Sequence, residues 1–183
     1  MESKLKNEHQ QQQKEHKTIG RTPEEITMEV KELITSLLQS LEKQDYESSI
    51  KMAERGVLLL PNDENFYVMK SIALRHLGRR KEAISYLEET LQKYPFFAIA
   101  TSLLALSLFE EGNIQSSLDL FDKAVKLDHT LSEAHYYKSQ ILVKMQRYKE
   151  ALEEIKKAVS MEPYDTNYQN FFQFVQKLAE LEE

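Results

Sequence analysis

The fold is decided by the segment RKEAISYLEETLQKYP at residues 80–95, because a segment of the same pattern, YKEALEEIKKAVSMEP, follows at residues 148–163. The two segments are separated by two repeat lengths. When the chain is shifted against itself by one repeat length, which brings Ala83 onto Ser117, further positions align in matching columns. The columns are Gln44, Gly78, Gly112 and Gln146; Ser49, Ala83, Ser117 and Ala151; Ala53, Leu87, Phe121 and Ile155; Gly56, Thr90, Ala124 and Ala158; and Pro61, Pro95, His129 and Pro163. This shift, the repeat length, predicts four repeats, at residues 30–63, 64–97, 98–131 and 132–165.

The repeats have the apolar spacing of helices. Apolar residues recur every three or four positions, and no window alternates with the period of two that a half-buried strand needs. We expect two antiparallel helices of about 13 or 14 residues in each repeat. In the last repeat these should span 135–145 and 148–161, with a turn at Gln146 and an end imposed by Pro163. Ala151 should lie where the two helices cross closely.

Both ends of the array carry their own signals. Order should begin at Thr22, a capping residue followed by Pro23 and Glu25 in the first helical turn. After Pro163, a last helix has an apolar face that should cover the final repeat, since a helix pair cannot bury its own apolar face. The alternative is that a partner protein also shares the surface of this helix. That face consists of Tyr168, Phe171, Phe172, Val175 and Leu178, with Gln169, Gln173, Gln176 and Glu180 opposite.

These signals predict six segments. They are a disordered polar arm at 1–21, a first repeat with an N-terminal helix extension at 22–63, repeats at 64–97, 98–131 and 132–165, and a capping helix at 166–183.

Composition excludes several classes of protein. The chain has no cysteine, so disulfides and thiol chemistry are excluded. The net charge is −6, and since residues 1–22 hold +2, the remainder holds −8 and would repel nucleic acid. The longest uncharged stretch, residues 94–109, is too short for a membrane span. The N-terminus lacks the apolar core of a signal peptide, so we expect a cytoplasmic location.

No residue pattern indicates catalysis, a metal or a cofactor. The histidines are scattered, and none forms the i, i+4 pair of a helical zinc site. His135 falls among core positions, where we expect a packing role. The pairs Glu88-Glu89 and Glu153-Glu154 should lie on outward helix faces, exposed to solvent. We therefore expect that the protein is not an enzyme.

The column residues carry a family resemblance. With Ala83, Leu87, Thr90 and Pro95 at their spacing, and again Ala151, Ile155, Ala158 and Pro163, the chain resembles tetratricopeptide-repeat proteins from residue 30 to 165. The repeat length agrees with that family's unit of about 34 residues. The first helices depart from the family pattern; His135, for example, stands where the family has an aromatic residue. The resemblance implies an all-α fold, a right-handed superhelical solenoid of antiparallel helix pairs.

The resemblance also implies a concave groove lined by the first helix of each repeat. The implied partner-binding positions are Ile34, Leu38, Val68, Ile72, Arg75, Ile99, Ser102, Leu106, Phe109, Tyr136, Gln140 and Val143. Most are apolar, and the opposite stripe of the same helices, which includes Tyr67, Leu74, Leu104 and Leu108, already supplies a core. We therefore expect the stripe of groove positions to have no structural task and to bind an extended or helical apolar segment of another protein. Phe96 and Phe97 should close the core.

Relatives that grip the C-terminal carboxylate of heat-shock chaperones use Lys, Asn and Arg at fixed groove positions. The matching positions here are Ile34, Leu38, Met69, Ile99 and Leu103, or, one repeat later, Val68, Ile72, Leu103, Glu133 and Tyr137. Neither set contains a cation, which argues against that ligand. The leading hypothesis is a non-catalytic adaptor or scaffold. The alternatives are a small cytoplasmic chaperone for an exported protein and a homo-oligomer that associates through the stripe.

Overall fold

The structure, a computed structural model, describes residues 22–181. This part of the chain contains helices and no strand, as the repeat spacing predicts. The helices are α2 (Pro23–Glu42), α3 (Tyr46–Leu59), α4 (Glu64–His76), α5 (Arg80–Lys93), α6 (Ala98–Glu110), α7 (Ile114–Leu127), α8 (Ser132–Lys144), α9 (Tyr148–Met161) and α10 (Thr166–Glu180). The predicted arm at 1–21 lies outside the described residues.

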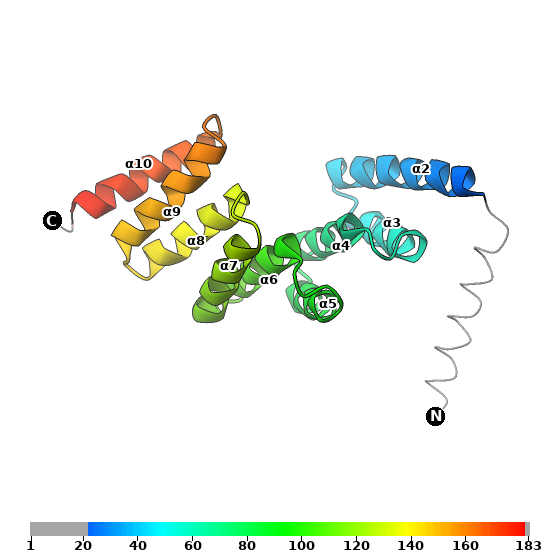
Figure 1. The fold of residues 1–183 in the computed structure, drawn as a ribbon, viewed down its shortest axis with the longest axis horizontal. Helices are drawn as coiled ribbons and strands as arrows, with labels where there is room; N and C mark the ends of the chain where they lie inside the picture. The colour runs from blue at the N-terminus through cyan, green and yellow to red at the C-terminus, as the bar shows by residue number, and fades with distance from the viewer. Residues whose placement is uncertain (1–21, 182–183) are drawn as a thin grey trace, which may run out of the picture.

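Each helix packs against the next along the chain, and the pairs form an elongated array with α2 at one end and α10 at the other (Figure 1). The first helices of neighbouring repeats also touch, α4 with α6 and α6 with α8. The helices α4, α6 and α8 therefore lie side by side in one layer of the array.

The turn column of the sequence has a conformational cause. Gln44, Gly78, Gly112 and Gln146 all have positive φ, at 58°, 73°, 85° and 59°. Each residue reverses the chain between the two helices of its repeat, and only glycine adopts this left-handed region without steric strain. The column therefore marks the turn inside every repeat, as predicted.

The first helix begins where the sequence indicates. Thr22 caps α2: its hydroxyl accepts a hydrogen bond from the Glu25 backbone N–H at 3.2 Å, and the Glu25 carboxylate accepts one from the Thr22 N–H at 2.8 Å. With Pro23 at the first helical position, this capping box satisfies backbone donors that would otherwise lack partners. The helix is 20 residues long, against 13 for α4, α6 and α8.

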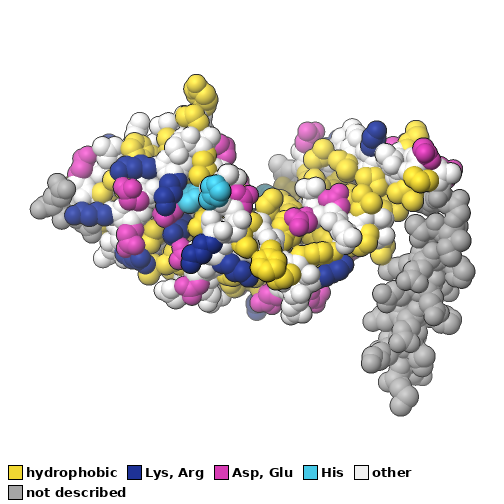
Figure 2. All heavy atoms as spheres, viewed as in Figure 1, with side chains coloured by type: hydrophobic (Ala, Val, Ile, Leu, Met, Phe, Trp, Pro, Cys, Tyr) yellow, Lys and Arg dark blue, Asp and Glu magenta, His cyan; other side chains and the backbone are white. Residues whose placement is uncertain are grey.

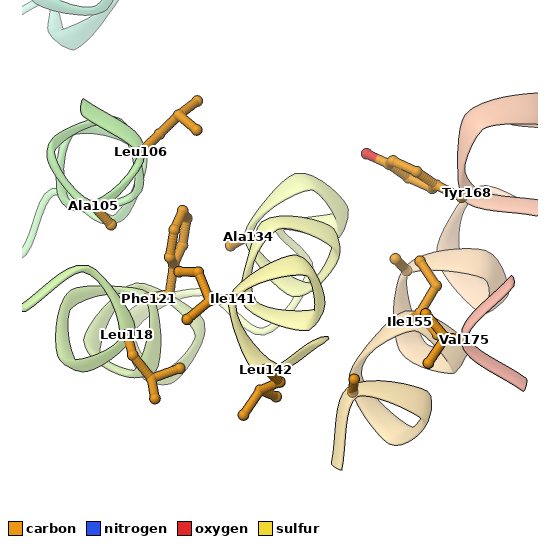
Figure 3. Packing of buried hydrophobic residues seen from close by; sticks show 12 residues of the cluster. Ala105, Leu106, Leu118, Phe121, Ala134, Ile141, Leu142, Ile155, Tyr168 and Val175 are labelled. Atoms are coloured by element: carbon orange, nitrogen blue, oxygen red, sulfur yellow. The ribbon is translucent and has the colours of Figure 1, made fainter. Parts of the chain in front are cut away.

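Small and large columns pack as expected. Ser49, Ala83, Ser117 and Ala151 are fully buried, and so are Ala53, Leu87, Phe121 and Ile155. Figure 3 shows Phe121 of α7 and Ile141 of α8 pointing toward one another, and likewise Ile155 of α9 and Val175 of α10. The core thus runs through the array rather than gathering in one centre. The loop aromatics differ from the prediction: Phe97 is buried, but Phe96 is 82% exposed and closes no core.

Charged pairs connect neighbouring repeats at every second junction of the array, at equivalent positions. Lys70 of α4 lies 2.8 Å from Glu54 of α3, and Lys138 of α8 lies 2.7 Å from Asp122 of α7. Each pair connects a repeat to its predecessor, and the second pair stands two repeats after the first. At the central junction the lysine position is occupied by Leu104, which is buried. The outer two junctions therefore combine an ion pair with apolar packing, while the central one is apolar at this position.

Gly56 of α3 faces the ring of Phe66, a side chain of α4 that is almost fully buried. A Cβ at residue 56 would lie 2.1 Å from Cδ1 of Phe66. Gly56→Ala should therefore destabilise the protein by about 1–2 kcal/mol, because overpacking outweighs the gain of about 1 kcal/mol in helix propensity. Urea unfolding followed by circular dichroism measures the difference. A stabilised variant would contradict this packing.

Candidate partner-binding groove

The predicted groove positions lie on α2, α4, α6 and α8, the first helices of the four repeats. Leu38 is 46% exposed and Ile99 is 42% exposed, so large apolar side chains do reach solvent at these positions. Figure 2 shows the surface hollowed between the part that ends in α10 and the part that contains α2, with hydrophobic side chains over the middle of the molecule. The remaining predicted positions are partly buried, with one exception.

The exception is Leu106, which is only 7% exposed and belongs to the core cluster of α6 to α10. In Figure 3 its side chain points away from Phe121 of α7, and its low exposure shows that neighbouring side chains cover it. The prediction that this position has no structural task is therefore wrong for Leu106. Leu103, one helical turn earlier, is also buried.

Arg75 has an unusual environment among the predicted groove residues. Its Nη2 lies 2.6 Å from the Glu110 carboxylate, which Arg80 also approaches at 3.3 Å. Burial by itself raises the pKa of Glu110, but these two arginines outweigh that effect and lower it. Among the described residues, Nε of Arg75 is buried without a hydrogen-bond acceptor. Arg75 therefore keeps one unsatisfied donor on the groove side of α4.

Aromatic rings continue the apolar surface beyond the predicted positions. Tyr136 of α8 lies 4.8 Å from Tyr168 and 5.4 Å from Phe171 of α10, between ring centroids, and Phe171 lies 6.0 Å from Phe174. Phe174 is 50% exposed. The sequence predicts a capping role for α10, with a surface shared with a partner as the alternative, and Phe174 is not among the predicted binding positions. Extending the groove columns by one more repeat length finds it, because Phe174 follows Gln140 at that distance.

A buried polar cluster lies under α8, away from the predicted groove positions. His135 Nδ1 donates to the Glu154 carboxylate at 2.6 Å, and Lys138 and Lys157 approach the same carboxylate at 3.0 and 3.1 Å. Burial alone raises the pKa of Glu154, but these hydrogen bonds outweigh it and lower the pKa to about 2. His135 has the predicted packing role. Glu154 is only 8% exposed, so the prediction that it faces solvent is wrong.

Residues 22–181 contain neither a cluster suited to a metal ion nor a helix suited to cross a membrane. No group of three or more His, Cys, Asp or Glu side chains is placed to hold a metal ion. No helix in that part of the chain is both long and apolar enough to cross a membrane.

Two family models match the chain. One, described as anaphase-promoting complex, cyclosome, subunit 3, matches residues 81–158, and the other, described as tetratricopeptide repeat, matches residues 64–92. A curated relative is the small glutamine-rich tetratricopeptide repeat-containing protein 2 of Mycosarcoma maydis, which is 24% identical over 90 residues. That alignment covers 49% of this chain and 26% of the relative, so the chain spans about a quarter of the relative's length.

Solved structures are similar in fold. A thermophilic tetratricopeptide-repeat protein of Thermus thermophilus has a TM-score of 0.65 at 19% identity, over 76% of this chain and 77% of that one. The first tetratricopeptide-repeat domain of Spaghetti (RPAP3), bound to an HSP90 peptide, has a TM-score of 0.59 at 16% identity, over 62% of this chain and 90% of that one. Since the family models, the curated relative and the solved solenoids all carry the repeat that this chain shows in register, the chain belongs to the tetratricopeptide-repeat proteins.

Proposed function

We propose that the protein is a non-catalytic adaptor that holds an apolar segment of another protein in the groove formed by α2, α4, α6 and α8. The observation that carries the proposal is the exposure of Leu38 and Ile99, at 46% and 42%, on helices whose other side is already packed. Exposed apolar side chains in a concave surface gain free energy when a partner covers them. The similar domain of Spaghetti, which binds a peptide, supports the same use of the fold here.

The ligand should differ from the chaperone tail bound by some relatives. The five positions of that carboxylate clamp carry Ile34, Leu38, Met69, Ile99 and Leu103, or one repeat later Val68, Ile72, Leu103, Glu133 and Tyr137. A terminal carboxylate would meet no cation at any of them. Affinity should come instead from apolar anchors that fill the spaces beside the exposed groove residues.

The proposal is tested with charged substitutions on the full chain, immobilised and exposed to extract from the source cells. Ile99→Lys and Leu38→Lys should each abolish the retention of proteins that bind the unmodified chain. The reason is that the apolar anchor of the partner would then contact an ammonium group. Leu58→Lys is the matched control, since Leu58 is 56% exposed but lies on α3, outside the groove layer.

Mass spectrometry of the retained proteins gives the readout. Proteins lost with both groove variants and kept with the control support the proposal. If the unmodified chain, both groove variants and the control all retain the same proteins, the proposal is contradicted. If the chain retains only further copies of itself, self-association through the groove replaces the proposal.

A further inference from the structure

The face of α10 that the second helix of a further pair would cover is polar. In the fourth repeat, the first helix is buried at His135, Ser139 and Leu142, and His135 contacts Glu154 of α9. The positions one repeat length later are all glutamines, Gln169, Gln173 and Gln176. Gln173 and Gln176 are exposed, and Gln169 donates to the Pro163 carbonyl at 2.9 Å. A glutamine face has no large apolar area to bury. A further helix, which would be the second helix of a fifth pair, is therefore not needed on this side of α10.

The groove side of the same helix is aromatic. Phe174 stands in the column of Leu38, Ile72, Leu106 and Gln140, one repeat length further along. It is half exposed, and through Phe171 its ring continues to Tyr136 of α8. A helix that served only as a cap would carry polar residues here as it does at its glutamine face. The two faces therefore indicate different roles, one closing the array and one extending the groove.

Cationic donors accompany the aromatic rings. Lys177 lies three residues after Phe174 and so shares its face of α10. Lys144 of α8 lies over the Phe109 ring, with 4.4 Å between Nζ and the ring centroid. Neither lysine forms an ion pair with any carboxylate of residues 22–181. The two exposed lysines therefore leave unpaired positive charge beside the groove residues Phe109 and Phe174.

We propose that α10 forms one end of the binding groove and that the occupant is an acidic segment of another protein, with an aromatic or aliphatic anchor against Phe171 and Phe174 and carboxylates opposite Lys177 and Lys144. The inference rests on the proposed function, since it adds a subsite and a ligand charge to the same groove. Carboxylates complete the unpaired lysines, whereas a basic segment would add like charge beside them.

A random peptide library displayed on phage, selected against the full chain, tests the ligand charge. Asp and Glu should be enriched around an aromatic or aliphatic residue in the selected peptides. Each selected peptide is then synthesised with one tryptophan. The protein contains no tryptophan, so the change in peptide fluorescence on binding reports only the peptide.

Two pairs of matched variants test the subsite. Phe174→Lys and Lys177→Glu should each weaken binding about tenfold or more, as expected for an apolar anchor and its charge partner. Gln173→Lys, next to Phe174 on the glutamine face, and Lys123→Glu, exposed on α7, should change affinity less than about twofold. Circular dichroism of all four variants should match that of the unmodified chain, because these side chains are exposed.

The outcomes separate this inference from the proposed function. Peptides that lose affinity with Ile99→Lys but bind the α10 variants normally, or that are enriched in Lys and Arg, overturn the α10 subsite and leave the groove. Selection of no peptide, or of peptides that ignore Ile99→Lys and both α10 variants, contradicts both proposals.

Discussion

Leu106→Lys should unfold the central repeats, whereas Ile99→Lys should leave them folded, although both residues stand in predicted groove columns of α6. Leu106 is 7% exposed and Ile99 is 42% exposed. A lysine at residue 106 would remove a buried leucine and bring an ammonium group among apolar neighbours, with a loss of stability of about 3 kcal/mol or more. At residue 99 the lysine can remain in water, and the change should be within about 0.5 kcal/mol.

Urea unfolding followed by circular dichroism at neutral pH measures both variants. Leu104→Lys provides the reference for a core position, since Leu104 is 6% exposed. The losses of stability at residues 104 and 106 should be similar. If Leu106→Lys were instead as stable as Ile99→Lys, residue 106 would be accessible groove surface, and the burial described above would not persist in solution.

The sequence could not distinguish these two residues because α6 has no polar face. Residues 98–109 are uncharged, and apolar side chains surround the helix axis on all sides. Hydrophobic spacing locates the buried face of a helix only when the other face is polar. In α9, where charged residues lie between the core positions Ala151, Ile155 and Ala158, the spacing predicts the buried apolar residues correctly and misses only the buried Glu154.

The features that were predictable depend on backbone constraints or on the register. The cap at Thr22 follows from the need to satisfy backbone donors at the start of a helix. The turn residues follow from the positive φ at the turn, and the buried small column follows from the close crossing of paired helices, both of which recur at the same place in every repeat. Glu154 was mispredicted because a charged residue was assigned to solvent without reference to its column. Its counterpart two repeats earlier is Tyr86, whose ring lies 4.3 Å from Nζ of Lys70. Lys138 is the counterpart of Lys70, so the register places Glu154 beside a lysine.

The Glu154 cluster should dominate the stability of the last repeat at neutral pH. Glu154→Gln keeps the shape of the side chain but removes the charge that His135, Lys138 and Lys157 share. A complete loss of a buried charge partner costs about 3–5 kcal/mol. Lys138 retains Asp122, and Lys157 is half exposed, so we expect a smaller loss of about 2–3 kcal/mol. Glu153→Gln is the matched control, because Glu153 pairs only with the exposed Lys156 and should contribute less than about 1 kcal/mol.

The pH dependence separates an electrostatic effect from a packing effect. Because the pKa of Glu154 is lowered from 4.5 to about 2 in the folded chain, the carboxylate contributes its full stability above about pH 4.5 and loses it as the pH falls toward 2. The difference in unfolding free energy between the unmodified chain and Glu154→Gln should therefore be constant from pH 7 to about 5 and shrink below that. The difference for Glu153→Gln should stay small throughout. A Glu154→Gln difference that is the same at pH 3 as at pH 7 would mean that the side chain stabilises the α8–α9 pair by packing, and that its charge contributes nothing.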